Sequence, residues 1–199
     1  MTGNHESILV VMALPLESGG ALEHSGARVL YTGVGKLNAA YVLTRELVQR
    51  AARGDPTLQL VLNLGTAGSS VHPAGTLVEC TRFVQRDMDA SPLGFAVGET
   101  PFDEHPPVLA GEAMFSQLAQ AACGSGDDFC LDYDTQQFQV VDMEAYALAK
   151  VCRLESVPFG CVKYITDGAS DAGAAGDWQQ TAHTAGEKLA ALLRSIASD

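Results

Sequence analysis

Short apolar runs alternate with amphipathic segments along most of this chain. The runs have the length of buried strands and end in turn residues, whereas the amphipathic segments repeat their apolar residues at helical spacing. The expected strands cover residues 7–15, 27–33, 58–65, 75–85, 116–125, 138–141 and 158–168. The expected helices cover residues 36–54, 142–154 and 177–196. This alternation predicts an α/β fold: a three-layer sandwich in which helices flank a mostly parallel or mixed sheet.

Two segments have less regular patterns. Residues 116–125 are compatible with a strand or a helix, and we favour a strand. Residues 87–116 are rich in Asp, Gly and Pro, and we expect a long loop there. Because loops of such length are uncommon in compact domains unless they serve a function, this loop is a candidate functional segment.

The composition limits what the chain can bind. Hydrophobic residues make up 47% of the 199 residues and charged residues 18%, which fits a single globular domain over residues 1–199. The formal net charge of −12 disfavours nucleic-acid binding, since Lys and Arg are not in excess. No run reaches the roughly 20 apolar residues of a membrane span, and residues 1–7 have no secretory signal pattern.

Cysteine and histidine spacing gives a further expectation. The five cysteines are scattered without a CxxC pair, which is typical of reduced thiols in a cytoplasmic protein. The five histidines show no metal-binding spacing. We therefore expect a cytoplasmic location and no structural metal.

Acidic residues follow several predicted strands. Glu17, Asp142, Glu144 and Asp167 come at or just after strand ends, which is where ligands bind in open α/β sheets. Each also has a simpler interpretation. Asp142 and Glu144 have the spacing of an N-cap and a first-turn residue of a helix, Asp167 that of a turn, and Glu17 that of a solvated first-turn residue.

Glycine-rich stretches lie at the same predicted edge. Taken alone, "GTAGSS" at 65–70 predicts a tight turn into the next strand. The stretch "GVGK" at 33–36 lacks the GxxxxGK[ST] frame of a P-loop, and the dinucleotide frame GxGxxG fails at Ala39. The glycines are therefore weak evidence by themselves.

The order of these motifs resembles one known family over nearly the whole chain. The chain resembles the nucleoside phosphorylase/nucleosidase superfamily and is most similar to the 5'-methylthioadenosine/S-adenosylhomocysteine nucleosidases. "VVDMEAYALAKVC" followed by "VPFGCVKYITDGAS" is the most specific part of the resemblance. The other matching stretches are "ILVVMALPLES", "TGVGKLNAA", "LVLNLGTAGSSVHPAGTLVEC", "FVQRDMDASPLGF" and "GSGDDF".

The resemblance implies a nucleoside phosphorylase-like fold and cofactor-free cleavage of an N-ribosidic bond in a small-molecule purine nucleoside. It implies that Asp167 is the general acid for the purine, with a pKa raised by burial. It further implies that Glu17 orients and deprotonates the attacking water, and that Glu144 accepts hydrogen bonds from the ribose hydroxyls.

Other positions are implied to bind the substrate. Met143 matches the residue that packs against the sugar, Phe129 the one that stacks on the base, and Cys130 the one whose backbone contacts the base edge. The turn facing the ribose and the water corresponds to Thr66, Ala67 and Gly68.

Two features favour water over phosphate as the nucleophile. The superfamily's phosphorylases hold phosphate with arginines, and at one such position this chain has Asn63. Glu17 would also repel phosphate. A phosphate-dependent phosphorylase, a futalosine-type hydrolase and a nucleoside-binding protein without catalysis stay open as alternatives.

The sequence departs from the family at several points. The regions 15–33 and 129–140 are shortened, and in the family they shape the pocket for the 5' substituent. Lys163 stands where the family often has Arg, and Thr166 stands where it has Ser. The resemblance also implies a homodimer in which the loop 87–106 of one subunit reaches the 5' pocket of its partner.

Overall fold

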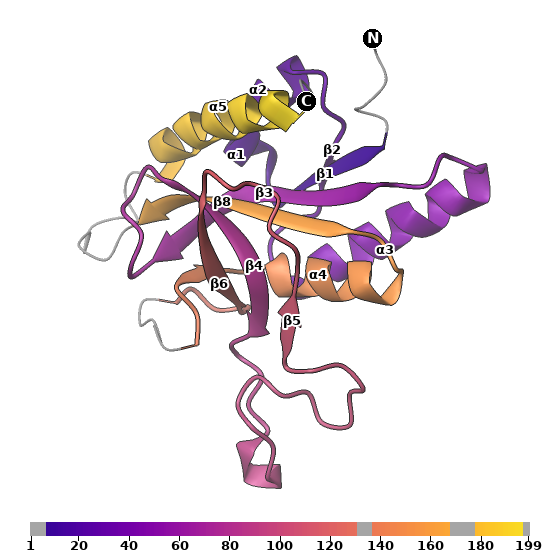
Figure 1. Ribbon diagram of the computed structural model, residues 1–199, viewed down its shortest axis with the longest axis vertical. Helices are drawn as coiled ribbons and strands as arrows, with labels where there is room; N and C mark the ends of the chain where they lie inside the picture. Colours follow the sequence, from indigo (N-terminus) through magenta and orange to yellow (C-terminus); the bar gives the residue numbers. More distant parts are fainter. Residues whose placement is uncertain (1–6, 131–136, 168–177, 197–199) are drawn as a thin grey trace.

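The computed structural model describes residues 7–130, 137–167 and 178–196, and in them an eight-stranded sheet lies between two groups of helices (Figure 1). The strands are β1 (Ile8–Met12), β2 (Val29–Tyr31), β3 (Leu60–Ser69), β4 (Leu77–Gln85), β5 (Val108–Ala110), β6 (Ala119–Ser125), β7 (Val140–Asp142) and β8 (Phe159–Asp167). The helices are α1 (Pro15–Ser18), α2 (Ala21–His24), α3 (Lys36–Arg53), α4 (Ala145–Leu154) and α5 (Trp178–Ile196).

The sheet is mixed and partly closed on itself. Strand β3 is parallel to β1 and β8, whereas β7 is antiparallel to β3, and β4 is antiparallel to β5 and β8. The pairings β3–β8, β8–β4, β4–β6, β6–β7 and β7–β3 return to the starting strand, so these strands form a barrel-like ring. The predicted α/β class, a mixed sheet flanked by helices, is confirmed.

Helices cover both faces of the sheet (Figure 1). On one face α5 lies with α1 and α2, and its Leu189 packs in the same apolar cluster as Leu62 of β3. On the other face α3 and α4 pack together, with Leu43 and Leu148 in one cluster with Val61. A further cluster of buried residues, mostly from β4, β6 and β8, lies within the ring and against α4. In the described part of the chain, no helix is long and apolar enough to cross a membrane.

Most predicted elements are confirmed within a few residues. The segment 116–125, which was compatible with either structure, contains strand β6. Helix α3 ends at Arg53, and the next residue, Gly54, adopts φ 72°, a left-handed conformation that glycine accepts without steric cost. The apolar stripe predicted for 177–196 is confirmed where side chains are described, since Ala185, Leu189 and Leu193 are buried.

The prediction of a turn at 65–70 is wrong. Strand β3 continues through the glycine-rich stretch to Ser69 because β8 pairs with it along this length and β7 pairs with its end. The small residues instead permit a register shift between Ala67 and Gly68. The loop expected at 87–116 also needs correction, since it contains the short 3-10 helix Ser91–Leu93 and strand β5, which pairs with β4.

Candidate active site

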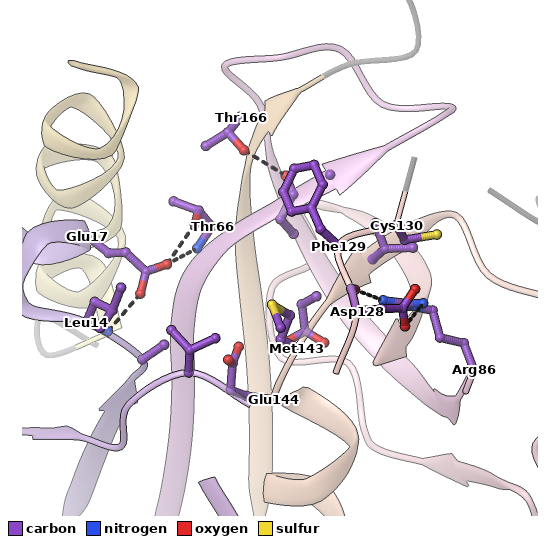
Figure 2. Close-up of a pocket in the computed structure, with 16 residues that line it drawn as sticks. Leu14, Glu17, Thr66, Arg86, Asp128, Phe129, Cys130, Met143, Glu144 and Thr166 are labelled. Carbon is purple, nitrogen blue, oxygen red and sulfur yellow. Dashed lines mark hydrogen bonds and ion pairs between the residues drawn. The ribbon is translucent and has the colours of Figure 1, made fainter. Parts of the chain in front are cut away.

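A cavity of about 410 Å³ lies at the carboxyl ends of the parallel strands, where the sequence predicted a ligand site. Nearly every residue named from the resemblance lines it, and the segments after β1, β2, β4 and β6 contribute to its walls (Figure 2). The lining residues are Ala13, Leu14, Glu17, Val34, Thr66, Ala67, Gly68, Arg86, Asp128, Phe129, Cys130, Val141, Asp142, Met143, Glu144 and Thr166.

Glu17 is buried, so the interpretation as a solvated first-turn residue is wrong. Pro15 opens the short helix α1, and Glu17 is 5% exposed. Its Oε2 accepts the Leu14 N–H at 3.0 Å, and its Oε1 accepts the Thr66 N–H at 2.9 Å and the Thr66 hydroxyl at 2.7 Å. Three donors from two chain segments therefore fix this carboxylate at the cavity wall.

Asp142 is a structural carboxylate. It ends β7 and is buried, with Oδ2 at 2.7 Å from Lys163 Nζ on β8. It also accepts the Ser125 hydroxyl at 2.5 Å and the Ala145 N–H at 2.9 Å. Burial alone would raise the pKa of Asp142, but Lys163 and these hydrogen bonds outweigh it and hold the pKa below its ordinary value.

The local pattern predicted Asp142 as the N-cap of the next helix. That position is wrong, although Asp142 does accept a hydrogen bond from the start of the helix. Glu144 occupies the N-cap position, yet its side chain makes no capping hydrogen bond. The donor nearest the helix start, the Ala145 N–H, is instead satisfied by Asp142 from the end of the strand.

Glu144 points into the cavity and has fewer hydrogen-bond donors around it than Glu17 or Asp142 (Figure 2). It is 8% exposed, and its Oε1 accepts the Gly35 N–H at 2.8 Å. Burial, together with the negative charge of Asp142, raises the pKa of Glu144 to about 7. Within the described residues, Gly35 is its one hydrogen-bond donor, so most of its acceptor capacity faces the cavity.

Phe129 and Cys130 line the wall across the cavity from Glu17 (Figure 2). Phe129 is 71% exposed, so a flat ligand can reach the face of its ring. Sequence reasoning missed Arg86 and Asp128 beside them. Arg86 Nη1 donates to Asp128 Oδ1 at 2.8 Å, and Nη2 donates to the Asp128 carbonyl. Arg86 directly follows β4, so its strand-end position is the signal that could have found it.

The remaining predicted positions lie around the floor of the cavity. Met143 is half-buried between Asp142 and Glu144, while Thr66, Ala67 and Gly68 belong to the end of β3. The backbone of Asp167 ends β8 and pairs with Gly68, but its side chain lies outside the described residues. Asn63 does not line the cavity; it is buried in β3, where its Nδ2 donates to the Val11 carbonyl at 3.1 Å.

Comparison with known proteins defines the class. The family model described as "Phosphorylase superfamily" matches residues 20–198. The chain belongs to this superfamily, as its motifs predicted. It is 31% identical over 74% of its length to the 5'-methylthioadenosine/S-adenosylhomocysteine nucleosidase of Anoxybacillus flavithermus, of which the match covers 70%. That similarity places the chain in the nucleosidase family of the superfamily.

Solved structures agree on the fold. The Helicobacter pylori 5'-methylthioadenosine/S-adenosylhomocysteine nucleosidase with butyl-thio-DADMe-Immucillin-A has a TM-score of 0.76 at 22% identity, covering 96% of this chain and 99% of that one. The Helicobacter pylori futalosine hydrolase has a TM-score of 0.78 at 21% identity, covering 98% of each chain. Together with the family, the cavity establishes a small molecule as the substrate.

Proposed function

We propose that this protein is an N-glycosyl hydrolase that cleaves the N-ribosidic bond of a purine nucleoside of the 5'-methylthioadenosine/S-adenosylhomocysteine type, releasing adenine and the ribose moiety. The observation that carries the proposal is the pair of buried carboxylates, Glu17 and Glu144, on one cavity whose opposite wall exposes Phe129. A carboxylate for the attacking water, a second for the ribose hydroxyls and an aromatic surface for the purine suit a reaction through an oxocarbenium-like sugar.

In this mechanism Glu17 orients and deprotonates the attacking water. A carboxylate has about four acceptor positions, and three are occupied by Leu14 and Thr66. The position that is left serves the water. Because the carboxylate is already fixed, little reorganisation is needed when the water attacks.

Glu144 binds the ribose hydroxyls. Its acceptor positions that Gly35 does not use face the cavity. The hydroxyls donate to the charged carboxylate, so substrate binding pulls its pKa down from about 7 and favours ionisation. Met143 packs beside the sugar and Phe129 stacks on the purine, while the backbone of Cys130 contacts the base edge.

Asp167 is the proposed general acid that protonates the leaving purine. The family resemblance and its position at the end of β8, beside Gly68, support this role. The expected consequence is that Asp167→Asn abolishes adenine release while binding of a substrate analogue changes little. Near-normal release by that variant would remove Asp167 from the mechanism.

Water is favoured over phosphate as the nucleophile by the charges around the cavity. Among the described residues that line the cavity, Arg86 is the one cation, and both of its Nη atoms are bonded to Asp128. Asn63, at the position of a phosphate-binding arginine, is turned into the sheet. A phosphate dianion would therefore meet the Glu17 carboxylate, while the buried cation close to it, Lys163, is already paired with Asp142.

A homodimer is the proposed assembly. On α3, Leu37, Tyr41 and Val48 are 80%, 63% and 58% exposed, and Phe102 of the loop 87–106 is 93% exposed. Apolar side chains of this size on one helix face and on a long loop favour burial against a second copy. Sedimentation velocity of wild type and Tyr41→Asp tests this, with a dimer expected only for wild type.

The test of the function is adenine release from 5'-methylthioadenosine, S-adenosylhomocysteine and adenosine, with and without phosphate. Release in phosphate-free buffer is expected, and the ranking of the three substrates defines the 5' group. Release that requires phosphate would contradict the hydrolase. Futalosine is included as a fourth substrate, because turnover of futalosine alone would indicate a futalosine-type hydrolase instead.

A further inference from the structure

The wall that exposes Phe129 is held by charged side chains, some of which line the cavity while others lie behind it. The base-wall segment, residues 127–130, follows β6 and has no regular secondary structure. Arg86, whose side chain is 7% exposed, bonds Asp128 through both Nη atoms. Its guanidinium lies so close to Gly126 that an added Cβ would be 2.6 Å from Cζ. This contact fixes one end of the segment.

Lys36 contacts the same segment at Asp127, on the side toward the start of α3. It begins α3 and does not line the cavity. Its Nζ bonds both carboxylate oxygens of Asp87 and lies 3.4 Å from Asp127 Oδ2. Its own N–H donates to Asp127 Oδ1 at 2.8 Å, and Asp127 N–H donates to Asp87 Oδ2 at 2.9 Å. A single ammonium thus joins two carboxylates from different chain segments.

The same helix start also holds Glu144. Gly35 N–H donates to Glu144 Oε1 at 2.8 Å, one residue before the amide that donates to Asp127. Gly35 has φ 96°, and a Cβ there would lie 3.2 Å from Asp127 Oδ1. Two successive amides therefore fix the carboxylate proposed to bind the sugar and the segment that carries the proposed base-stacking ring.

We propose that Lys36 is a positioning residue that sets the spacing between the base-stacking wall and the sugar-binding carboxylate. This inference rests on the proposed function. Lys36 touches neither base nor sugar; it acts through Asp87 and Asp127 on the base-wall segment, and through the start of α3 on Glu144. The coupling makes base recognition and ribose recognition depend on one ion-pair cluster.

Loss of the ammonium has a defined physical consequence. Without Lys36 Nζ, the carboxylates of Asp87 and Asp127 face each other across a partly buried space and repel. The base-wall segment then moves away from the start of α3, and Phe129 moves with it. The effect should fall on binding of the base more than on the bond-breaking step.

The experiment compares Lys36→Met, Lys36→Arg and a matched control, Arg28→Met. Arg28 also forms an ion pair with α3, through Glu46 at 2.7 Å, but it comes before β2 and does not line the cavity. The readouts are the dissociation constant of free adenine by calorimetry, and kcat and KM for 5'-methylthioadenosine. If Lys36→Met does not fold, Lys36→Gln replaces it, because the amide retains a donor.

We expect Lys36→Met to raise the adenine dissociation constant and KM about tenfold while kcat changes less than about threefold. Lys36→Arg should restore most of the affinity, and Arg28→Met should leave it unchanged. Combined with Phe129→Leu, the effects of Lys36→Met should be less than additive, because both act on the same base contact.

Two results would overturn the inference: adenine affinity within about twofold of wild type in Lys36→Met, or full additivity with Phe129→Leu. A wild type that binds adenine but hydrolyses no nucleoside would refute the proposed function alone, since the adenine affinities would still test Lys36. A wild type that does not bind adenine would overturn both.

Discussion

The segment after β1 and the joint between β7 and α4 each bring a glutamate to the same cavity, but they hold it differently. Glu17 accepts three hydrogen bonds from Leu14 and Thr66, whereas Glu144 accepts one from Gly35 and lies near the buried charge of Asp142. The first carboxylate is fixed in position. The second has its pKa raised to about 7. The same residue type therefore has different contacts at the two positions, and its neighbouring groups determine which role each glutamate can take.

The buried Lys163 on β8 lies close to the carboxylates of both regions. A Cβ on Gly65 would be 3.4 Å from Glu17 Oε1 and 3.6 Å from Lys163 Nζ, so both groups approach the same point of β3. Lys163 pairs directly with Asp142, and its positive charge also acts to lower the pKa of Glu144. One buried cation thus stabilises a structural acid on one side and lies close to two acids of the proposed mechanism.

The largest expected effect comes from removing the fixed carboxylate. Glu17→Gln keeps the shape of the side chain but cannot accept a proton from water, so kcat should fall about 10³-fold. Affinity for 5'-methylthioadenosine should stay within a few-fold, which calorimetry measures beside the rate of adenine release. A variant that keeps more than a tenth of wild-type kcat would show that Glu17 has no role as a base.

The second prediction breaks the buried pair. Lys163→Met leaves the Asp142 carboxylate buried beside Ser125 without its cation, which should cost about 4 kcal/mol of unfolding free energy. Urea unfolding at pH 7 measures it. The control is Arg28→Met, because Arg28 is more than half exposed and its ion pair should contribute less than about 1 kcal/mol. Equal losses in the two variants would mean that Asp142 and Lys163 are not coupled as the structure indicates.

The two glutamate regions also show which parts of the fold and of the site the sequence could predict. The strands, the helices and the strand-end location of Glu17 and Glu144 follow from apolar periodicity and from motif order. The family resemblance assigned Glu144 and not Asp142 to the substrate, but the local pattern gave both acids the same capping interpretation and no reason for the difference. That distinction depends on Lys163, which is adjacent only because β8 and β7 flank the same strand β3.

Other errors have the same physical origin. The stretch 65–70 has the local composition of a turn, but pairing with β8 and β7 keeps it extended. Arg86 and Lys36 were not predicted because each acts on the base-wall segment through contacts between residues distant in the chain. Local patterns identify secondary structure well, whereas ion pairs between elements require the assembled sheet.

The third prediction uses the raised pKa of Glu144. Its folded pKa is about 7 against an ordinary value of 4.5, so the folded state holds the proton more tightly than the unfolded chain. This contribution to stability is present below pH 4.5 and is lost as pH rises to about 7, roughly 3 kcal/mol in all. Glu144→Gln should remove this part of the pH dependence while weakening substrate binding.

The measurement for Glu144→Gln is urea unfolding at several pH values from 4.5 to 8. Relative to wild type, the variant should gain stability as the pH rises from 4.5 to about 7, and the difference should level off above that pH. Glu17→Gln, which removes the other buried glutamate of the cavity, is measured in parallel. Parallel pH profiles for wild type and Glu144→Gln would refute the raised pKa.

The smallest expected effect tests how firmly Glu17 must be held. Thr66→Val keeps the N–H that donates to Glu17 Oε1 but removes the hydroxyl that donates at 2.7 Å. One lost hydrogen bond to a charged acceptor corresponds to about 1.5 to 3 kcal/mol, so kcat should fall at least about tenfold while KM changes little. Thr66→Ser retains the hydroxyl and should recover most of the rate. If Thr66→Val instead raised KM and left kcat intact, the hydroxyl would serve the ribose directly, and the backbone donors from Leu14 and Thr66 would suffice to fix the base.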